Sequence, residues 1–128
     1  MEIKQYLNGV QHIGIPTNDM AQTVAFYQGL GFALAYQTVN GSETVSFLQL
    51  GNLVIEAYEN GKAVLHSGAI DHIAIDVTDI TAVYELAKAA DYTIVEDAVQ
   101  FLPFWEHGVK YFNIKGPNQE TIEFCQRL

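Results

Sequence analysis

Hydrophobic and polar positions alternate along this chain in two stretches that follow the same order. Residues 9–15 alternate with the two-residue period of a strand, and residues 70–76 do so again. A helix-start signal follows each strand, with Asp19 after the first and Asp79 after the second. The two stretches can be aligned residue by residue, which pairs His12 with His72, Ile13 with Ile73, Ile15 with Ile75 and Asp19 with Asp79. This predicts a repeated supersecondary module.

The first module, about residues 8–59, reads as strand, helix and three further strands. Met20, Val24 and Tyr27 fall at helical spacing, and Gly29 is a plausible end to that helix. Asn40-Gly41 is a strong signal for a tight turn. The predicted strands are residues 9–15, 32–39, 44–50 and 53–59.

The second module, about residues 70–126, repeats that order after a connector at residues 60–69. Its helix is expected to begin after Asp79 and to pack through one face, formed by Ile80, Val83, Tyr84 and Ala87. A long aromatic loop is expected at residues 101–107. The predicted strands are residues 70–76, 92–99, 109–115 and 120–126.

These elements predict an α+β fold of two tandem βαβββ modules, with a curled mixed sheet around a cup and the helices outside. The 128 residues are expected to form one domain, because a module of about 60 residues is near the lower limit for folding alone. A hydrophobic content of 49% supplies enough material for a shared core.

Charge and composition exclude several classes of function. The formal net charge is −9, and the six basic residues are scattered, so nucleic acid is not an expected partner. No apolar run is long enough for a membrane helix, and the N-terminus does not read as a signal peptide. Cys125 is the one cysteine, which suits a reducing compartment. We therefore expect a cytoplasmic protein.

Each module carries one histidine and one glutamate on the face opposite its aliphatic side chains. In residues 53–57 and 121–125, strand alternation separates Glu56 and Glu123 from the aliphatic residues that should pack beneath a helix. His12 and His72 are expected on the first strands, facing the same side as the glutamates. If the sheet curls, the first and last strands can bring these four side chains together.

Two imidazoles and two carboxylates in such a cup predict a metal site. Neighbouring carboxylates resist ionising together, and a divalent cation removes that penalty. Mixed nitrogen and oxygen ligands suit Zn, Ni, Co, Fe or Mn. Four protein ligands on an ion that prefers six leave positions for water or substrate, as a catalytic metal requires. The alternative is that each of these residues is an exposed strand residue with no ligand role.

At this point the sequence resembles the vicinal oxygen chelate superfamily, which includes glyoxalase I, extradiol dioxygenases and bleomycin-binding proteins. The resemblance covers nearly the whole chain. It is carried by residues 12–15, 26–32, 53–56, 71–75, 116–118 and 122–124. The full His, Glu, His, Glu set is similar to that of glyoxalase I. The resemblance implies that His12, Glu56, His72 and Glu123 bind one divalent ion, with Ni or Zn first and Co, Fe or Mn as alternatives, in a chain that forms a homodimer.

The resemblance also implies a reaction. A substrate with neighbouring oxygens, such as a hemithioacetal or an α-hydroxy carbonyl, would lose a proton to a carboxylate and pass through an enediolate. Glu123 is expected to be the base, with Glu56 as the second catalytic carboxylate. The usual arginine of glutathione-dependent members is replaced in this chain by Pro16 and Thr17. The resemblance therefore does not identify glutathione as the thiol.

Two other functions within the same superfamily remain open from the sequence. One is an extradiol-type dioxygenase with Fe(II), and the other is a non-catalytic protein that binds small molecules or drugs. Loop aromatics are expected to wall the substrate pocket. The predicted substrate-binding residues are Tyr58, Phe101, Phe104, Trp105 and His107, and the resemblance to glyoxalase I adds Asn60, which matches a glutathione-contacting asparagine position of that family.

Overall fold

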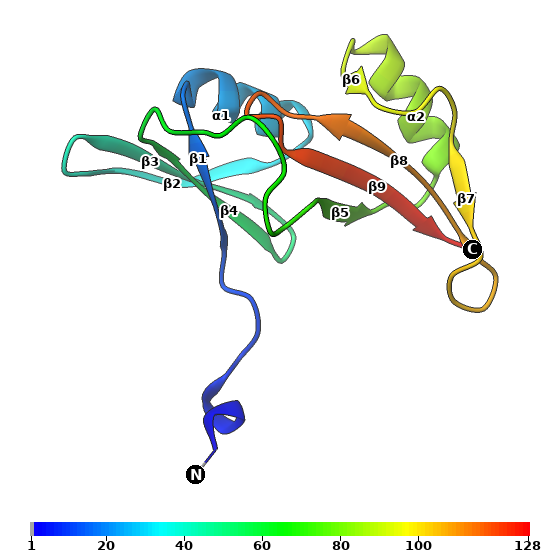
Figure 1. Cartoon of the computed structure of the whole chain (residues 1–128), viewed down its shortest axis with the longest axis horizontal. Coiled ribbons are helices and arrows are strands. Elements are labelled where there is room, and N and C mark those ends of the chain that lie inside the picture. The colour runs from blue at the N-terminus through cyan, green and yellow to red at the C-terminus, as the bar shows by residue number, and fades with distance from the viewer. Residues whose placement is uncertain (1) are drawn as a thin grey trace. The chain divides into compact units, whose positions relative to one another are not determined.

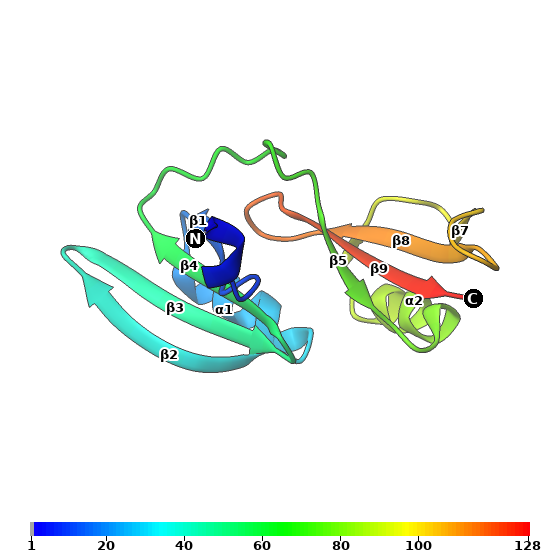
Figure 2. The same cartoon turned by 90° about the horizontal axis from the view of Figure 1, so that it is seen from below.

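The computed structural model of the chain describes residues 2–128. These residues form two compact units, residues 2–63 and residues 64–128, which are considered separately (Figures 1 and 2). The prediction of a single domain concerns how the two units associate, and it stays a prediction. Neither α-helix among residues 2–128 is long and apolar enough to cross a membrane.

The first unit has the predicted order of strand, helix and three strands, preceded by a short 3-10 helix. Its sheet has the order β1-β4-β3-β2, in which β1 runs parallel to β4 and the other pairs are antiparallel. The elements are η1 (Ile3–Tyr6), β1 (Ile13–Thr17), α1 (Met20–Gly29), β2 (Ala33–Asn40), β3 (Glu43–Leu50) and β4 (Leu53–Glu59). The α+β fold with βαβββ modules is therefore confirmed in this unit.

The second unit repeats the arrangement, except that two short strands, β6 and β7, follow the helix where the first unit has the single strand β2. Its sheet has the order β5-β9-β8-β6, and β7 also pairs with β8. Again the first strand, β5, runs parallel to the last, β9. The elements are β5 (Ile73–Asp76), α2 (Ile80–Ala89), β6 (Thr93–Ile94), β7 (Gln100–Leu102), β8 (Val109–Lys115) and β9 (Thr121–Arg127).

The predicted strand at residues 92–99 is wrong beyond Ile94, and the predicted loop at 101–107 begins with part of β7. The reason is a side chain that replaces backbone pairing. Oε1 of Glu96 accepts the backbone N–H of Asn113 at 2.7 Å, while Val95 N–H donates to the Asn113 carbonyl at 2.9 Å. The chain leaves the ladder at this point and rejoins β8 at Gln100.

Each helix packs on one face of its sheet, as Figure 1 shows for α1 and α2. Tyr27 from α1 is fully buried with Leu48 and Ile55 in the first unit. In the second unit the fully buried side chains are Ile80, Phe112, Ile114 and Ile122. The burial alternates along β4 and β9, so the aliphatic face lies inward and the face of Glu56 and Glu123 lies on the other side. This confirms the predicted division of the strand faces.

The last strand of each unit also fixes the start of its helix. Asp19 and Asp79 accept the predicted N-cap hydrogen bonds, from Gln22 N–H at 3.0 Å and Ala82 N–H at 3.1 Å. Three residues after Glu56 and after Glu123, a side chain of the last strand accepts a further backbone N–H from the first turn of the helix. These acceptors are Glu59 for Met20 N–H at 2.5 Å and Gln126 for Ile80 N–H at 2.9 Å.

Candidate functional site

The parallel strand pair of each unit places one glutamate beside one histidine. Gly14 pairs with Glu56 in the first unit and Ala74 pairs with Glu123 in the second. The prediction that first and last strands meet is therefore confirmed within each unit. The prediction that the histidines lie on the first strands is wrong, because both parallel ladders begin one residue later, at Ile13 and Ile73.

In the first unit, His12 Nε2 lies 3.2 Å from Glu56 Oε2. The opposite ring nitrogen, Nδ1, lies 3.1 Å from the side-chain oxygen of Gln11. The edge of the imidazole meets Phe47, with ring centroids 5.9 Å apart. The imidazole is therefore held at both nitrogens and against an aromatic ring, with Nε2 directed toward the carboxylate.

The second unit repeats this geometry with a different partner at Nδ1. His72 Nε2 lies 3.8 Å from Glu123 Oε2, and His72 Nδ1–H donates to Asp71 Oδ2 at 2.8 Å. An ionised carboxylate can only accept, so Asp71 places a proton on Nδ1, and in the neutral imidazole the lone pair is then on Nε2. Metal-binding histidines commonly use this arrangement, with one nitrogen on a carboxylate or carbonyl and the other on the metal.

The donor set of each unit therefore fits a divalent cation, with one imidazole nitrogen and one carboxylate on the same side of the sheet. Within the described residues, no group of three or more His, Cys, Asp or Glu side chains is assembled to hold a metal. Each unit supplies a pair, and the four-ligand site that joins both pairs remains a proposal.

Burial raises the pKa of Glu123 above that of an ordinary glutamate, His72 lowers it, and Glu96 raises it. The side chain of Glu123 is 17% exposed, which is consistent with desolvation as the largest cause. Burial also raises the pKa of the Cys125 thiol, with further increases from Glu123 and Asp76. Cys125 lines the site as a protonated thiol at neutral pH, which is a poor nucleophile.

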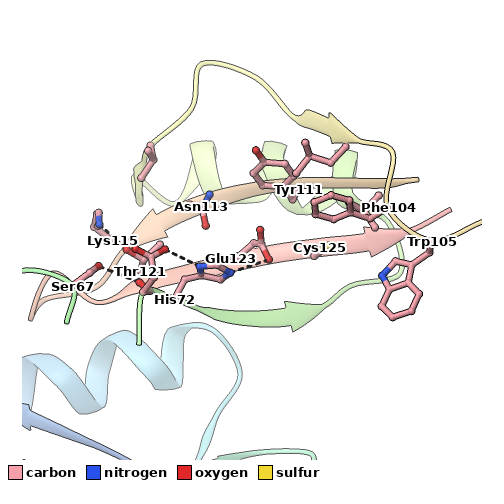
Figure 3. Close-up of a pocket in the computed structure, with 14 residues that line it drawn as sticks. Ser67, His72, Phe104, Trp105, Tyr111, Asn113, Lys115, Thr121, Glu123 and Cys125 are labelled. Atoms are coloured by element: carbon pink, nitrogen blue, oxygen red, sulfur yellow. Dashed lines mark hydrogen bonds and ion pairs between the residues drawn. The ribbon is translucent and has the colours of Figure 1, made fainter. Parts of the chain in front are cut away.

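A cavity of about 620 Å³ lies over the face of β8 and β9 in the second unit (Figure 3). Asn113 and Glu123 face each other across the two strands in the middle of this surface. The cavity wall on one side carries Phe104 and Trp105 from the loop after β7. The polar lining on the other side comes from Ser67, Asp71, His72, Lys115 and Thr121.

Asn113 and Lys115 are cavity residues that sequence reasoning missed. The alternation of residues 109–115 could have identified them, because Asn113 and Lys115 share a face and pair with Glu123 and Thr121. Glu96 could not have been found in this way. Its Oε2 accepts from Asn113 Nδ2 at 2.7 Å, which turns the amide oxygen of Asn113 away from Glu96.

The predicted substrate-binding residues are only partly brought together. Phe104 and Trp105 line the same cavity as Glu123, whereas Phe101 and His107 do not line it. The ring of Phe101 lies against Gly108, and His107 pairs with Glu106 at 3.6 Å in the exposed loop.

The other two predicted contacts belong to the first unit. Tyr58 lies on the face of Glu56, with its ring close to Gly14. Asn60 accepts the backbone N–H of Lys62 at 2.9 Å, which makes it a turn residue.

Comparison with known proteins identifies a matching family model and a related sequence. Residues 9–124 match the model of the Glyoxalase/Bleomycin resistance protein/Dioxygenase superfamily. The protein YwbC of Bacillus subtilis (strain 168), named as uncharacterized, is 30% identical over 125 residues, which cover 92% of this chain and 97% of YwbC.

Solved structures with the same fold include a glyoxalase family protein from Enterococcus faecalis. It is 18% identical, with a TM-score of 0.76 over 94% of this chain and 98% of its own. The fosfomycin resistance protein FosX from Listeria monocytogenes, complexed with Mn(II) and sulfate, is 16% identical. Its TM-score is 0.72, over 95% of this chain and 94% of its own.

The charges around Glu123 predict opposite pKa changes for two substitutions in metal-free protein. Replacing His72 by Gln removes an imidazole whose protonated form lowers the pKa of Glu123, so the pKa should rise. Replacing Glu96 by Gln removes a negative neighbour and should lower it. Carbon-13 NMR of the labelled carboxylates measures both values. His107→Gln is the control that should leave the pKa unchanged, and a shift of the same sign in both test variants would contradict the assignment.

Proposed function

Because the chain belongs to the Glyoxalase/Bleomycin resistance protein/Dioxygenase superfamily, we propose that it is a metal-dependent lyase or isomerase of the glyoxalase I kind. Its substrate is a small molecule with neighbouring oxygens, either a hemithioacetal or an α-hydroxy carbonyl. The metal ligands are His12, Glu56, His72 and Glu123, and the ion is Ni or Zn, with Co, Fe or Mn as alternatives.

The observation that carries this proposal is the duplicated pair. Two sequences that differ at most positions both set a histidine Nε2 beside a glutamate Oε2, at 3.2 Å and 3.8 Å. In both pairs a side-chain oxygen lies within hydrogen-bond distance of the other ring nitrogen, from Gln11 at 3.1 Å and from Asp71 at 2.8 Å. A partner at the second ring nitrogen is common to nearly all metal-binding histidines, whereas a structural salt bridge needs a partner at one nitrogen only.

A divalent ion, when bound, would polarise the substrate carbonyl and make the adjacent C–H more acidic. The residues of the chain then have to hold and move one proton. Glu123 is suited to accept it, because burial raises its pKa toward the working pH and its carboxylate lines the cavity. Glu56, on the matching strand of the other unit, is assigned to return a proton to the neighbouring carbon.

The walls of the cavity offer apolar surface to a substrate. Val95, Leu102 and Val109 add apolar surface to that of Phe104 and Trp105. Glu96 holds the Asn113 amide beside Glu123, so the central pair of the cavity surface is fixed before substrate binds.

Mn(II) in the FosX structure is a property of that protein, and the support for a metal in this chain comes from the two pairs. The homodimer and the cytoplasmic location stay predictions. An extradiol-type dioxygenase would require oxygen uptake with a catechol, and a small-molecule-binding protein would bind its ligand without turnover. Oxygen consumption by the Fe(II)-loaded protein with a panel of catechols tests the first function, and turnover of bound ligand tests the second.

Purified protein loaded with Ni or Zn should retain about one ion per chain after dialysis, as measured by elemental analysis. His12→Ala, His72→Ala and Glu56→Gln should each reduce the retained metal, because each removes one of the four donors. Glu123→Gln should lower kcat for the active compound in a hemithioacetal and α-hydroxy carbonyl panel by about 100-fold or more.

His66→Ala is the matched control, because His66 is an exposed connector histidine whose Nδ1 contacts the Ser67 carbonyl at 2.9 Å. It should match the wild type in metal content and turnover. The proposal fails if the loaded protein holds no metal, or if His12→Ala and His72→Ala retain as much as His66→Ala. Ligand binding without turnover in the metal-loaded protein would point to the binding function.

Asp71 gives a separate prediction, because it orients a proposed ligand without being one. Asp71→Ala should weaken metal binding by about 10- to 100-fold, since it removes the acceptor that fixes the His72 ring. Asp71→Asn, which retains an oxygen as Gln11 does in the first unit, should recover part of the loss. Calorimetric titration measures both affinities. Asp97→Ala, another exposed carboxylate of the second unit, is the control, and an equal effect there would contradict the role of Asp71.

A further inference from the structure

The cavity of the second unit contains a lysine that the proposed mechanism does not use. Lys115 is the last residue of β8 and pairs directly with Thr121 of β9. Its Nζ donates to Thr121 Oγ1 at 2.6 Å, and both side chains line the cavity. Figure 3 shows this pair on the same strands as Asn113 and Glu123, and it is the next cross-strand pair on the same face.

Lys115 is the one lysine or arginine that lines this cavity in the described part of the chain. Among residues 2–128, no carboxylate forms an ion pair with it, whereas Lys4 and Lys88 pair with Glu2 and Glu85. Arg127 is engaged elsewhere, with its guanidinium 4.1 Å from the centre of the Trp105 ring. In a chain of net charge −9, a half-buried ammonium bonded only to a neutral hydroxyl is available for an anion.

The hydrogen bonds of this pair also favour an anion. The ammonium has three N–H donors and uses one on Thr121. Because Thr121 Oγ1 accepts that bond, its own hydroxyl hydrogen is left to donate. Lys115 and Thr121 together therefore present several donors and one positive charge, which is the chemistry that binds a carboxylate or a phosphate.

The position of the pair relates this charge to the proposed reaction. Adjacent cross-strand pairs on the same face are about 7 Å apart along a strand. A ligand with its reacting carbon at Glu123 can therefore place a group a few bonds away between Lys115 and Thr121. Asp71 and Glu123 are also in the cavity, but both interact with His72.

We propose that Lys115 and Thr121 form an anion subsite, so that the substrate is an α-oxygenated carbonyl compound carrying one carboxylate or phosphate group. This inference rests on the proposed function for the place of the reacting carbon. A single cation sets the preference for one anionic group, and the apolar surface of Phe104 and Trp105 leaves the remainder of the ligand without a second charge partner.

Three probes that share an α-hydroxy carbonyl test this assignment: dihydroxyacetone, hydroxypyruvate and dihydroxyacetone phosphate. Calorimetry with the metal-loaded full chain at fixed, low ionic strength should show at least one anionic probe binding about tenfold or more tightly than neutral dihydroxyacetone. The two anionic probes distinguish carboxylate from phosphate. Lys115→Met should abolish this preference and leave the affinity for dihydroxyacetone unchanged.

Lys110→Met is the matched control, because Lys110 lies on the same strand but is exposed and does not line the cavity. It should preserve the preference for the anionic probe. The assignment is overturned if the wild type binds all three probes equally, if Lys115→Met keeps the preference, or if Lys110→Met loses it to the same extent. Thr121→Val should lower the preference without removing it, because the charge of Lys115 remains.

Metal content separates a failure of the subsite from a failure of the proposed function. Lys115→Met should retain as much metal as the wild type, because Lys115 is not among the proposed ligands. Equal binding of all probes by a protein that retains its metal overturns the anion subsite alone. A protein without metal that still prefers the anionic probe through Lys115 supports the subsite and overturns the metal-dependent function.

Discussion

The parallel pairing of the first and last strands is the constraint on which each unit of this protein depends. In both units it sets a glutamate opposite the residue two positions after a histidine, through Gly14 with Glu56 and Ala74 with Glu123. The same last strand then fixes the start of the helix through Glu59 or Gln126. One backbone arrangement therefore holds the helix, separates the two faces of the sheet and directs a carboxylate toward an imidazole.

The two units use this arrangement with different surroundings. In the first, His12 has the neutral partner Gln11 and lies against Phe47. In the second, His72 has the anionic partner Asp71, and its glutamate lies in a cavity where burial raises the carboxyl pKa. The proposed division of roles follows from this difference, with Glu123 as the better proton acceptor.

The sequence predicted the parts of the fold that depend on periodicity. Alternation along residues 53–57 and 121–125 was sufficient to separate Glu56 and Glu123 from the buried side chains, and the caps Asp19 and Asp79 were found from residue type and spacing. The interruption between β6 and β7 could not be predicted. It depends on Glu96 bonding to Asn113, a contact between residues 17 positions apart that no local pattern records.

The candidate site was predicted only in part for the same reason, because its side-chain contacts join residues that are not neighbours in a local pattern. His12 and His72 were identified from the repeat, but the acceptors at Nδ1 and the missed residue Lys115 become evident only when the strands are paired. Phe104 and Trp105 reach the cavity while Phe101 turns toward Gly108, a difference set by the course of one loop. Aromatic composition by itself did not distinguish these three residues.

The central claim is that histidines and glutamates of both units bind the same ion, and X-ray absorption spectroscopy of the nickel-loaded full chain tests it most directly. The account predicts a first shell with two imidazole nitrogens per nickel together with oxygen ligands, and one imidazole fewer after either His12→Ala or His72→Ala. A shell with a single imidazole in the wild type, or one that is unchanged by both substitutions, would contradict the account.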